Sequence, residues 1–136
     1  MKKIQTDIPQ KPILLIKFWQ EEDYKDVIYN EKVYTVIAGD DVGNLVGIDN
    51  KGNAFYIDTE YKTVRYMSDT AETLIKQLLY YEKSCNDETY RNISDLELPE
   101  FLAQFKKDLM RMDISAFKSE ENFWSVIVEQ METGLL

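Results

Sequence analysis

Three aspartates, Asp40, Asp41 and Asp49, lie close enough in the sequence to suggest carboxylate chemistry. Neighbouring carboxylates can hold Ca²⁺ or act as an acid/base pair in hydrolysis. The segment 49–53 matches no EF-hand loop, because a lysine and a glycine occupy positions where alternating ligands are needed. Aspartates in such segments more commonly shape turns by accepting hydrogen bonds from their own backbone. We therefore predict turn-forming aspartates, with no metal and no cofactor, and a carboxylate-based hydrolase is the least favoured function.

Histidine is absent from the sequence. Its absence excludes Ser–His and Cys–His nucleophile pairs, imidazole metal ligands and histidine general bases. The single cysteine, Cys85, excludes an intrachain disulfide and fits a reducing compartment. We expect Cys85 to be a semi-buried small hydrophobe at the end of a helix. The residues therefore predict a protein that is not an enzyme.

Glycine and lysine patterns add no catalytic motif. Gly39, Gly43 and Gly47 are spaced four apart and open no helix, so they match neither a P-loop nor a dinucleotide fingerprint. We interpret them as turn and bulge glycines. The pair Lys106 and Lys107 is predicted to lie on the solvated face of an amphipathic helix and not in a nucleic-acid patch.

The charge is strongly negative, with 25 acidic and 16 basic residues among 136 and a formal net charge of −9. Such a field repels nucleic acid and anionic lipid, so neither is predicted as a partner. It either attracts a basic protein or simply keeps the protein soluble, and composition alone favours solubility. The apolar run 13–18 is too short to cross a bilayer and no signal peptide is visible, so we expect a cytoplasmic protein. The length is typical of one domain, residues 1–136.

Short runs rich in β-branched and aromatic residues predict a sheet. The four clearest runs cover residues 33–38, 45–49, 54–58 and 63–67. The breaks between them carry Gly, Asn and Asp, so the runs should form an antiparallel meander. The polar residues 1–12 should be extended. The apolar run 13–19 predicts a buried strand or the end of a short helix, and the acidic segment 20–32 an exposed loop or an irregular strand.

After residue 67 the apolar period changes from two to 3.6. Asp69 as cap, with Glu72 reaching back, predicts a helix of about 14 residues that ends near Cys85. The apolar face of this helix should comprise Ala71, Leu74, Ile75, Leu78 and Leu79. Residues 86–97 are predicted to form a long loop.

Two further amphipathic helices are predicted beyond this loop. One begins at Pro99, and the other begins at Ser119 and ends at Gly134, with Leu135 folding back onto the last turn. The fold class is therefore α+β: an antiparallel twisted meander of four to six strands packed against about three C-terminal helices.

The candidate partner-binding residues are acidic or aromatic and are expected at the surface. They are Glu21, Glu22, Asp23, Tyr24, Asp40, Asp41, Tyr80, Asp87, Glu88 and Tyr90. Tyr80 points nearly opposite the apolar helix face. It is therefore either an exposed interface anchor or a side chain covered by the loop 86–97.

Several short segments, taken in order, resemble the SUKH superfamily and in particular its fourth subgroup of bacterial immunity proteins. These segments are 34–41 with its Gly-Asp-Asp turn, 45–55 with its Ile-Asp step and turn glycine, Met67-Ser68 before a Leu/Tyr-rich helix, and the closing Phe123-Trp124, Glu129 and Gly134-Leu135. The resemblance spans residues 33–136. It implies an α+β domain in which Asp41, Asp49 and Gly52 shape the fold and are not catalytic.

The same resemblance implies a function. The chain would bind and neutralise a cognate polymorphic toxin by stoichiometric contact. Many such toxins act on nucleic acids, and a basic toxin domain would suit an acidic binder. The alternative is a regulatory or scaffolding module without a toxin partner, as eukaryotic relatives of the superfamily imply. A homodimer is compatible with both functions.

Overall fold

The β-branched runs form an antiparallel sheet of six strands within residues 9–134, the part of the chain that the computed structural model describes. The strands are β1 (Lys17–Phe18), β2 (Lys25–Tyr29), β3 (Lys32–Gly39), β4 (Leu45–Ile48), β5 (Ala54–Asp58) and β6 (Thr63–Ser68). The order across the sheet is β1-β3-β4-β5-β6, and β2 pairs with β3 beside β1. The predicted four-run meander is confirmed to within one residue at each boundary.

Of the two forms predicted for the apolar run 13–19, the helix end is wrong, and the buried strand is correct only for Lys17–Phe18. Ile13 and Ile16 exchange backbone hydrogen bonds of 2.9 and 3.0 Å around a tight turn, in which Leu14 has φ 58°. Only the two residues of β1 then pair with β3. This turn buries Ile13 and Ile16 together with Phe18, which a continuous strand would direct to opposite faces.

The acidic segment 20–32 begins with a short 3₁₀ helix, η1 (Glu21–Asp23), and continues as β2. Of the two predicted alternatives the strand is correct, and it is regular, because its pairing with β3 is unbroken from Lys25 to Tyr29. The two-residue connection, Asn30 and Glu31, has φ values of 51° and 66°. Positive φ at both positions defines a type I′ turn, whose twist matches that of the flanking strands.

The sheet buries side chains on both of its faces. Val46 and Ile48 belong to the cluster that packs against the helices, whereas Tyr34 and Ile57 are buried but lie outside that cluster. Gly47 sits between the latter two on β4, where an added Cβ would lie 2.8 Å from the Tyr34 Cβ and 2.9 Å from the Ile57 Cδ1. Gly47 is therefore a close-packing glycine in mid-strand and not a turn glycine. It does pair with Val36 where the β3–β4 register shifts at a β-bulge, so the predicted association with a bulge holds.

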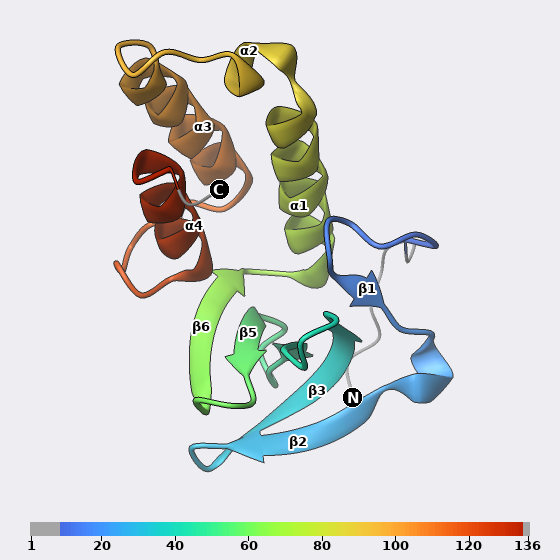
Figure 1. Cartoon of the computed structure of the whole chain (residues 1–136). Helices are drawn as coiled ribbons and strands as arrows, with labels where there is room; N and C mark the ends of the chain where they lie inside the picture. Colours follow the sequence, from blue (N-terminus) through green and yellow to red (C-terminus); the bar gives the residue numbers. More distant parts are fainter. Residues whose placement is uncertain (1–8, 135–136) are drawn as a thin grey trace.

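The helices gather on one side of the sheet, and β6 leads directly into the first of them (Figure 1). They are α1 (Ala71–Asn86), α2 (Glu88–Arg91), α3 (Leu98–Met112) and α4 (Phe123–Glu132). The α+β class is confirmed. The predicted loop 86–97 contains the short helix α2, because Asp87 caps a helical turn through a 2.8 Å bond from the Thr89 N–H.

Two predicted helix starts differ from the observed ones. Thr70, and not Asp69, caps α1, since its hydroxyl oxygen accepts the Thr73 N–H at 3.0 Å. The last helix begins at Phe123 and not at Ser119. Ser119 instead accepts a turn hydrogen bond from the Asn122 N–H at 3.1 Å.

The side chain of Leu79 is 47% exposed, so its predicted place on the apolar face of α1 is wrong, and Tyr81 is buried in the cluster instead. Gly134 has φ +76° directly after α4, which confirms it as the left-handed stop. The predicted contact of Leu135 lies outside the described residues.

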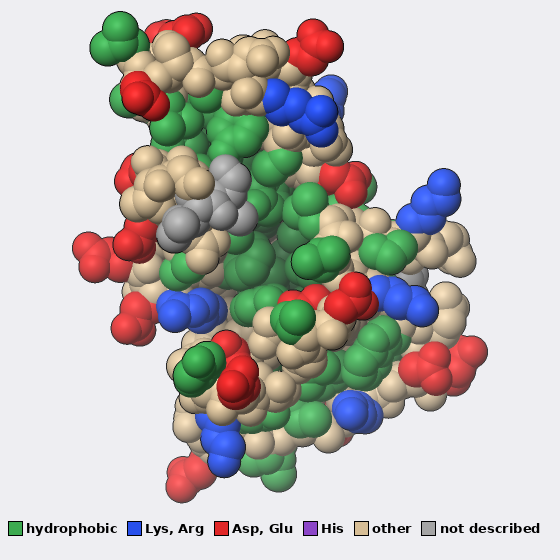
Figure 2. Space-filling model, viewed as in Figure 1, with side chains coloured by type: hydrophobic (Ala, Val, Ile, Leu, Met, Phe, Trp, Pro, Cys, Tyr) green, Lys and Arg blue, Asp and Glu red, His purple; other side chains and the backbone are tan. Residues whose placement is uncertain are grey.

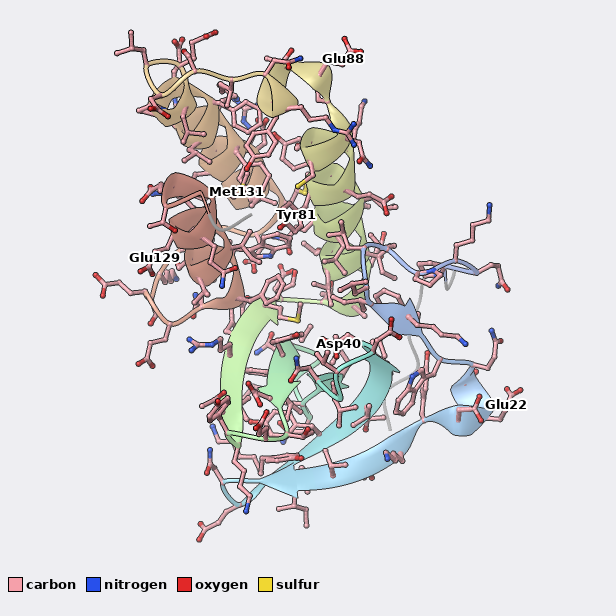
Figure 3. All side chains as sticks on the ribbon, in the orientation of Figure 1. Glu22, Asp40, Tyr81, Glu88, Glu129 and Met131 are labelled. Atoms are coloured by element: carbon pink, nitrogen blue, oxygen red, sulfur yellow. The ribbon has the colours of Figure 1, made fainter. Side chains whose placement is uncertain are left out.

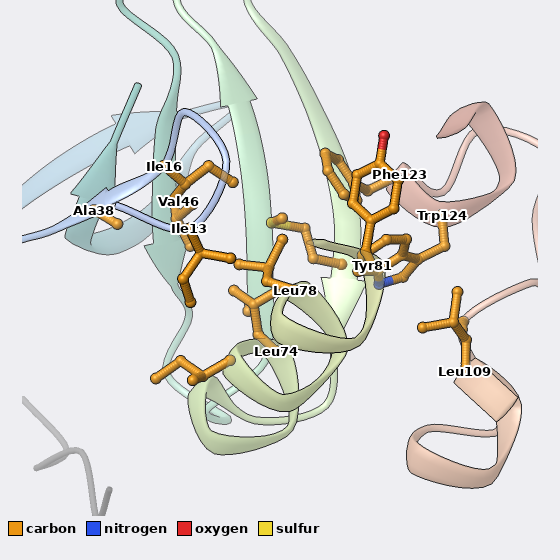
Figure 4. Close-up of a cluster of buried hydrophobic side chains, with 14 of the residues drawn as sticks. Ile13, Ile16, Ala38, Val46, Leu74, Leu78, Tyr81, Leu109, Phe123 and Trp124 are labelled. Atoms are coloured by element: carbon orange, nitrogen blue, oxygen red, sulfur yellow. The ribbon is translucent and has the colours of Figure 1, made fainter. Parts of the chain in front are cut away.

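The core between sheet and helices centres on aromatic rings (Figure 4). Trp124 is fully buried, and its indole N–H donates to the Gln77 Oε1 at 3.1 Å. The Trp124 ring meets Tyr81 edge-on at 5.6 Å and Phe123 at 5.0 Å. Near the end of α1, Cys85 is half-buried, as predicted. These contacts join the first and last helices to each other.

We predict that Glu31→Gly raises the free energy of unfolding by about 1 kcal/mol, because Glu31 holds a left-handed conformation that costs a residue with a Cβ. Asn30→Gly is the matched control and should change stability by less than about 0.5 kcal/mol, since asparagine tolerates this region. Chemical denaturation measures both. Equal effects of the two substitutions would contradict the type I′ assignment.

Candidate functional site

The turn aspartates behave as their spacing predicts. The Asp40 Oδ1 accepts the N–H of Val42 at 3.0 Å and of Asn44 at 2.9 Å. The Asp49 carboxylate does the same for its own turn, accepting the Lys51 N–H at 2.9 Å. The two turns lie at opposite ends of β4, so Asp40 and Asp49 do not share a site. Within residues 9–134, no group of three or more acidic or sulfur ligands is placed to hold a metal ion.

Asp40 is also tied to the sheet. Its Oδ2 accepts the Tyr56 hydroxyl at 2.7 Å and the Asn44 side-chain amide at 3.1 Å. Burial alone would raise the pKa of this carboxyl, but the hydrogen bonds from Tyr56, Asn44 and Val42 outweigh it and lower the pKa. Asp40 is thus engaged within the fold, whereas its neighbour Asp41 is exposed on the turn.

Tyr80 is neither a free anchor nor covered by the loop 86–97, so both predictions for it are corrected. Its ring stacks on Phe105 of α3 at 5.5 Å, and its hydroxyl donates to the Asp108 Oδ2 at 2.6 Å. Burial and this carboxylate raise the pKa of Tyr80 to about 12. The side chain fastens α1 to α3.

The predicted residues after α1 lie at the far end of the helical layer. Glu88 is exposed on α2, and Asp87 caps that helix. The Tyr90 ring stacks on Phe101 at 5.0 Å and is half-buried. Figure 3 places the labelled Glu88, Asp40 and Glu22 in three separate regions. The candidate residues therefore do not converge on one site.

The remaining candidates precede β2 and form its acidic flank. Glu21, Glu22 and Asp23 are exposed on η1, and Glu22 points away from the body of the molecule (Figure 3). Tyr24 is half-buried, and burial followed by the charge of Glu21 raises its pKa. Glu31 is exposed at the other end of the strand. Carboxylates thus flank β2 at both ends.

These flanking carboxylates are not neutralised by neighbours. Among the described residues only two ion pairs are present, Glu72 with Lys76 and Asp108 with Arg111. Figure 2 shows acidic side chains dispersed over the visible face. Because the formal net charge is −9 and few carboxylates are paired, the surface carries an uncompensated negative potential.

The open backbone groups of β2, beside these carboxylates, were not predicted from the sequence. In a two-residue hairpin the pair next to the turn is hydrogen-bonded, and such pairs alternate along the ladder. The N–H and C=O groups of Asp26 and Ile28 therefore point away from β3, and no other backbone hydrogen bond reaches them from the described residues. β2 is the outermost strand at the lower edge of the sheet in Figure 1.

Exposed apolar side chains lie on the same two strands. Ile28 is 71% exposed, and Val33, its pairing partner on β3, is 52% exposed. On the same face, the Thr35 hydroxyl donates to the Asp26 Oδ1 at 2.8 Å. We name the strand β2 with η1, Glu31 and the Ile28/Val33 pair the β2 edge. A clue in the sequence was the asparagine at residue 30, which favours a tight hairpin turn.

A concave region between α3 and α4 was also not predicted from the sequence. It has a volume of about 480 Å³ and is lined by Phe117 and Val128 with Lys106, Glu129 and Glu132 at its rim. The predicted helix start at residue 119 gave no indication of this region, because residues 119–122 lie before α4. Lys106 lies 5.4 Å from the centre of the Phe117 ring and so occupies part of its opening. The lining of this region is mainly polar or charged.

The chain matches no known protein-family model, no curated protein and no solved structure. Within the described residues, no helix is both long and apolar enough to cross a lipid bilayer. What the chain binds is therefore inferred from its own surface.

We predict that Tyr56→Phe raises the pKa of Asp40 toward its ordinary value of 3.8. A carboxyl with a lowered folded-state pKa contributes stability that is complete above its unfolded pKa and is lost as the pH falls through the folded one. The acid-induced loss of stability below pH 3.8 should therefore be smaller in the variant. Carboxyl NMR titration and denaturation across this range measure the two effects. Tyr61→Phe, at an exposed tyrosine, is the control, and equal behaviour of both variants would contradict the assignment.

Proposed function

We propose that this chain is an immunity protein of the SUKH superfamily that binds a cognate toxin domain and neutralises it by stoichiometric contact. The observation that carries the proposal is the excess of exposed carboxylates without an ion-pair partner among the described residues, which includes the carboxylates of the β2 edge. Five carboxylates against two lysines occupy residues 20–32, and none of the five forms an ion pair within the described part of the chain.

The physics of association favours a basic partner. Exposed charge of one sign speeds diffusional encounter with the opposite sign and discriminates against like-charged proteins. A toxin domain that acts on nucleic acid needs a basic surface for its own substrate. An acidic protein that covers this surface would block substrate access and needs no catalysis.

Two of the segments that carry the family resemblance are turns of the sheet. The Gly-Asp-Asp step is the turn between β3 and β4, and Asp49 shapes the turn after β4. Gly52 follows with φ +90°, a conformation that glycine adopts without strain. This supports the expectation that these residues shape the fold.

The first experiment is to co-express the chain with a toxin domain encoded beside its gene. Protection of the host, together with a one-to-one complex at low salt, is the expected result. A lysate pull-down that instead recovers several housekeeping proteins, with no protection from the toxin, would favour a regulatory scaffold and contradict the immunity function.

We predict that the triple variant Glu21→Gln, Glu22→Gln, Asp23→Asn lowers the association rate with the toxin domain several-fold at low ionic strength, because it removes charge beside the contact. The rate should also depend less on salt than that of the wild type. Stopped-flow mixing at several salt concentrations measures both.

The matched control removes three charges between α3 and α4 through Glu120→Gln, Glu129→Gln and Glu132→Gln. It alters the net charge equally but should slow association less. A larger effect of the control would place the contact between α3 and α4.

A further inference from the structure

We infer that the β2 edge binds its partner by β-augmentation, taking up an extended basic segment of the partner as a further strand beside β2. This inference rests on the proposed function and names the part of the surface and the kind of partner segment involved.

The open backbone of β2 supplies the binding groups. The N–H and C=O groups of Asp26 and Ile28 face outward, and the described residues offer them no other backbone partner. β2 has five residues and is therefore about 17 Å long at the usual rise of a strand. A partner segment of similar length would pair with both outward-facing residues, as in other complexes that extend a sheet.

The strand at the opposite edge, β6, is tied to the helical layer by its side chains. The Arg65 guanidinium on β6 donates to the Glu121 carbonyl oxygen at 2.8 Å, and the Tyr66 hydroxyl donates to the Asp113 Oδ2 at 2.7 Å. β6 also packs against α1 and α4. Unprotected edge strands invite pairing with other chains, and the exposed Ile28 and Val33 mark the β2 edge as open to solvent.

The side chains around β2 define the partner segment. The exposed Ile28 and Val33 pair favours an apolar or β-branched residue at the neighbouring position of the added strand. Exposed carboxylates on η1 and at Glu31 favour lysine or arginine at the ends of that strand. The fitting occupant is therefore an extended segment with an apolar centre and basic ends.

A second copy of this chain fits less well. Pairing two β2 strands antiparallel about Val27 would bring Asp23 on η1 of each copy toward Glu31 in the turn of the other. Like charges repel, and each copy carries a net charge of −9. The charge of the β2 edge thus selects a basic partner over self-association.

The test uses the full ¹⁵N-labelled chain and a blocked peptide, acetyl-Lys-Lys-Val-Thr-Val-Lys-Lys-amide, followed by NMR titration. We expect the largest amide shifts at Asp26 and Ile28, with slower hydrogen exchange at both. A peptide of the same sequence with N-methylated valines should bind more weakly, because it lacks strand donors. A peptide with glutamate in place of lysine should not bind.

Ile28→Pro is the decisive variant. Its ring removes an N–H that points outward, so the ladder with β3 stays intact, and proline is tolerated at such edge positions. Affinity for the peptide should fall by at least about fivefold, the value of one hydrogen bond. Ile28→Thr keeps the N–H and the β-branch and should bind within about twofold of the wild type. Circular dichroism confirms that both variants fold.

Three results would overturn the inference. These are equal binding by both variants, peptide shifts confined to the region between α3 and α4, or a homodimer of the free chain that Ile28→Pro abolishes. The same variants in the toxin complex separate this inference from the proposed function. If Ile28→Pro still neutralises the toxin with wild-type affinity, augmentation fails and the immunity function stands. If the peptide binds at β2 but the toxin is never neutralised, the immunity function fails and the binding edge stands.

Discussion

The Trp124 indole fixes how the two layers of this protein meet. It is fully buried, donates to Gln77 of α1 and touches Tyr81 on the same helix. Its neighbour Phe123 reaches the sheet, where its ring lies 5.1 Å from that of Tyr56. Aromatic contacts therefore connect the sheet, α4 and α1 in series. Aromatic rings bury large areas with defined geometry, so these contacts set the position of α4 against the sheet.

α4 and the segment before it anchor β6 to the helical layer. α4 packs against β6, and the Arg65 guanidinium donates to the Glu121 carbonyl oxygen. At the other edge, β1 is only two residues long, and β2 extends beyond it along β3. The same packing that completes the core thus leaves β2 as a rigid strand with open backbone groups. A binding surface on a strand that the fold holds in place loses little conformational freedom when a partner binds.

Charge acts at two levels in this molecule. Some carboxylates stabilise the fold. Asp40 and Asp49 accept hydrogen bonds within turns, and Asp108 accepts one from the Tyr80 hydroxyl. Others, such as Glu22 and Glu88, are exposed and have no ion-pair partner in the described residues. The first group acts through local hydrogen bonds, whereas the second creates the long-range field on which a role in binding a basic protein depends.

The four-strand meander, the turn role of Asp40 and the stop at Gly134 could be predicted from the sequence, because these depend on side-chain alternation and on backbone preferences within a few residues. The turn at Ile13, the regular strand β2 and the position of Tyr80 could not be predicted in this way. Each of these depends on a partner far away in the sequence: the core, β3 or α3. The β2 edge belongs to the second group, since an open edge exists only when the neighbours of every strand are known.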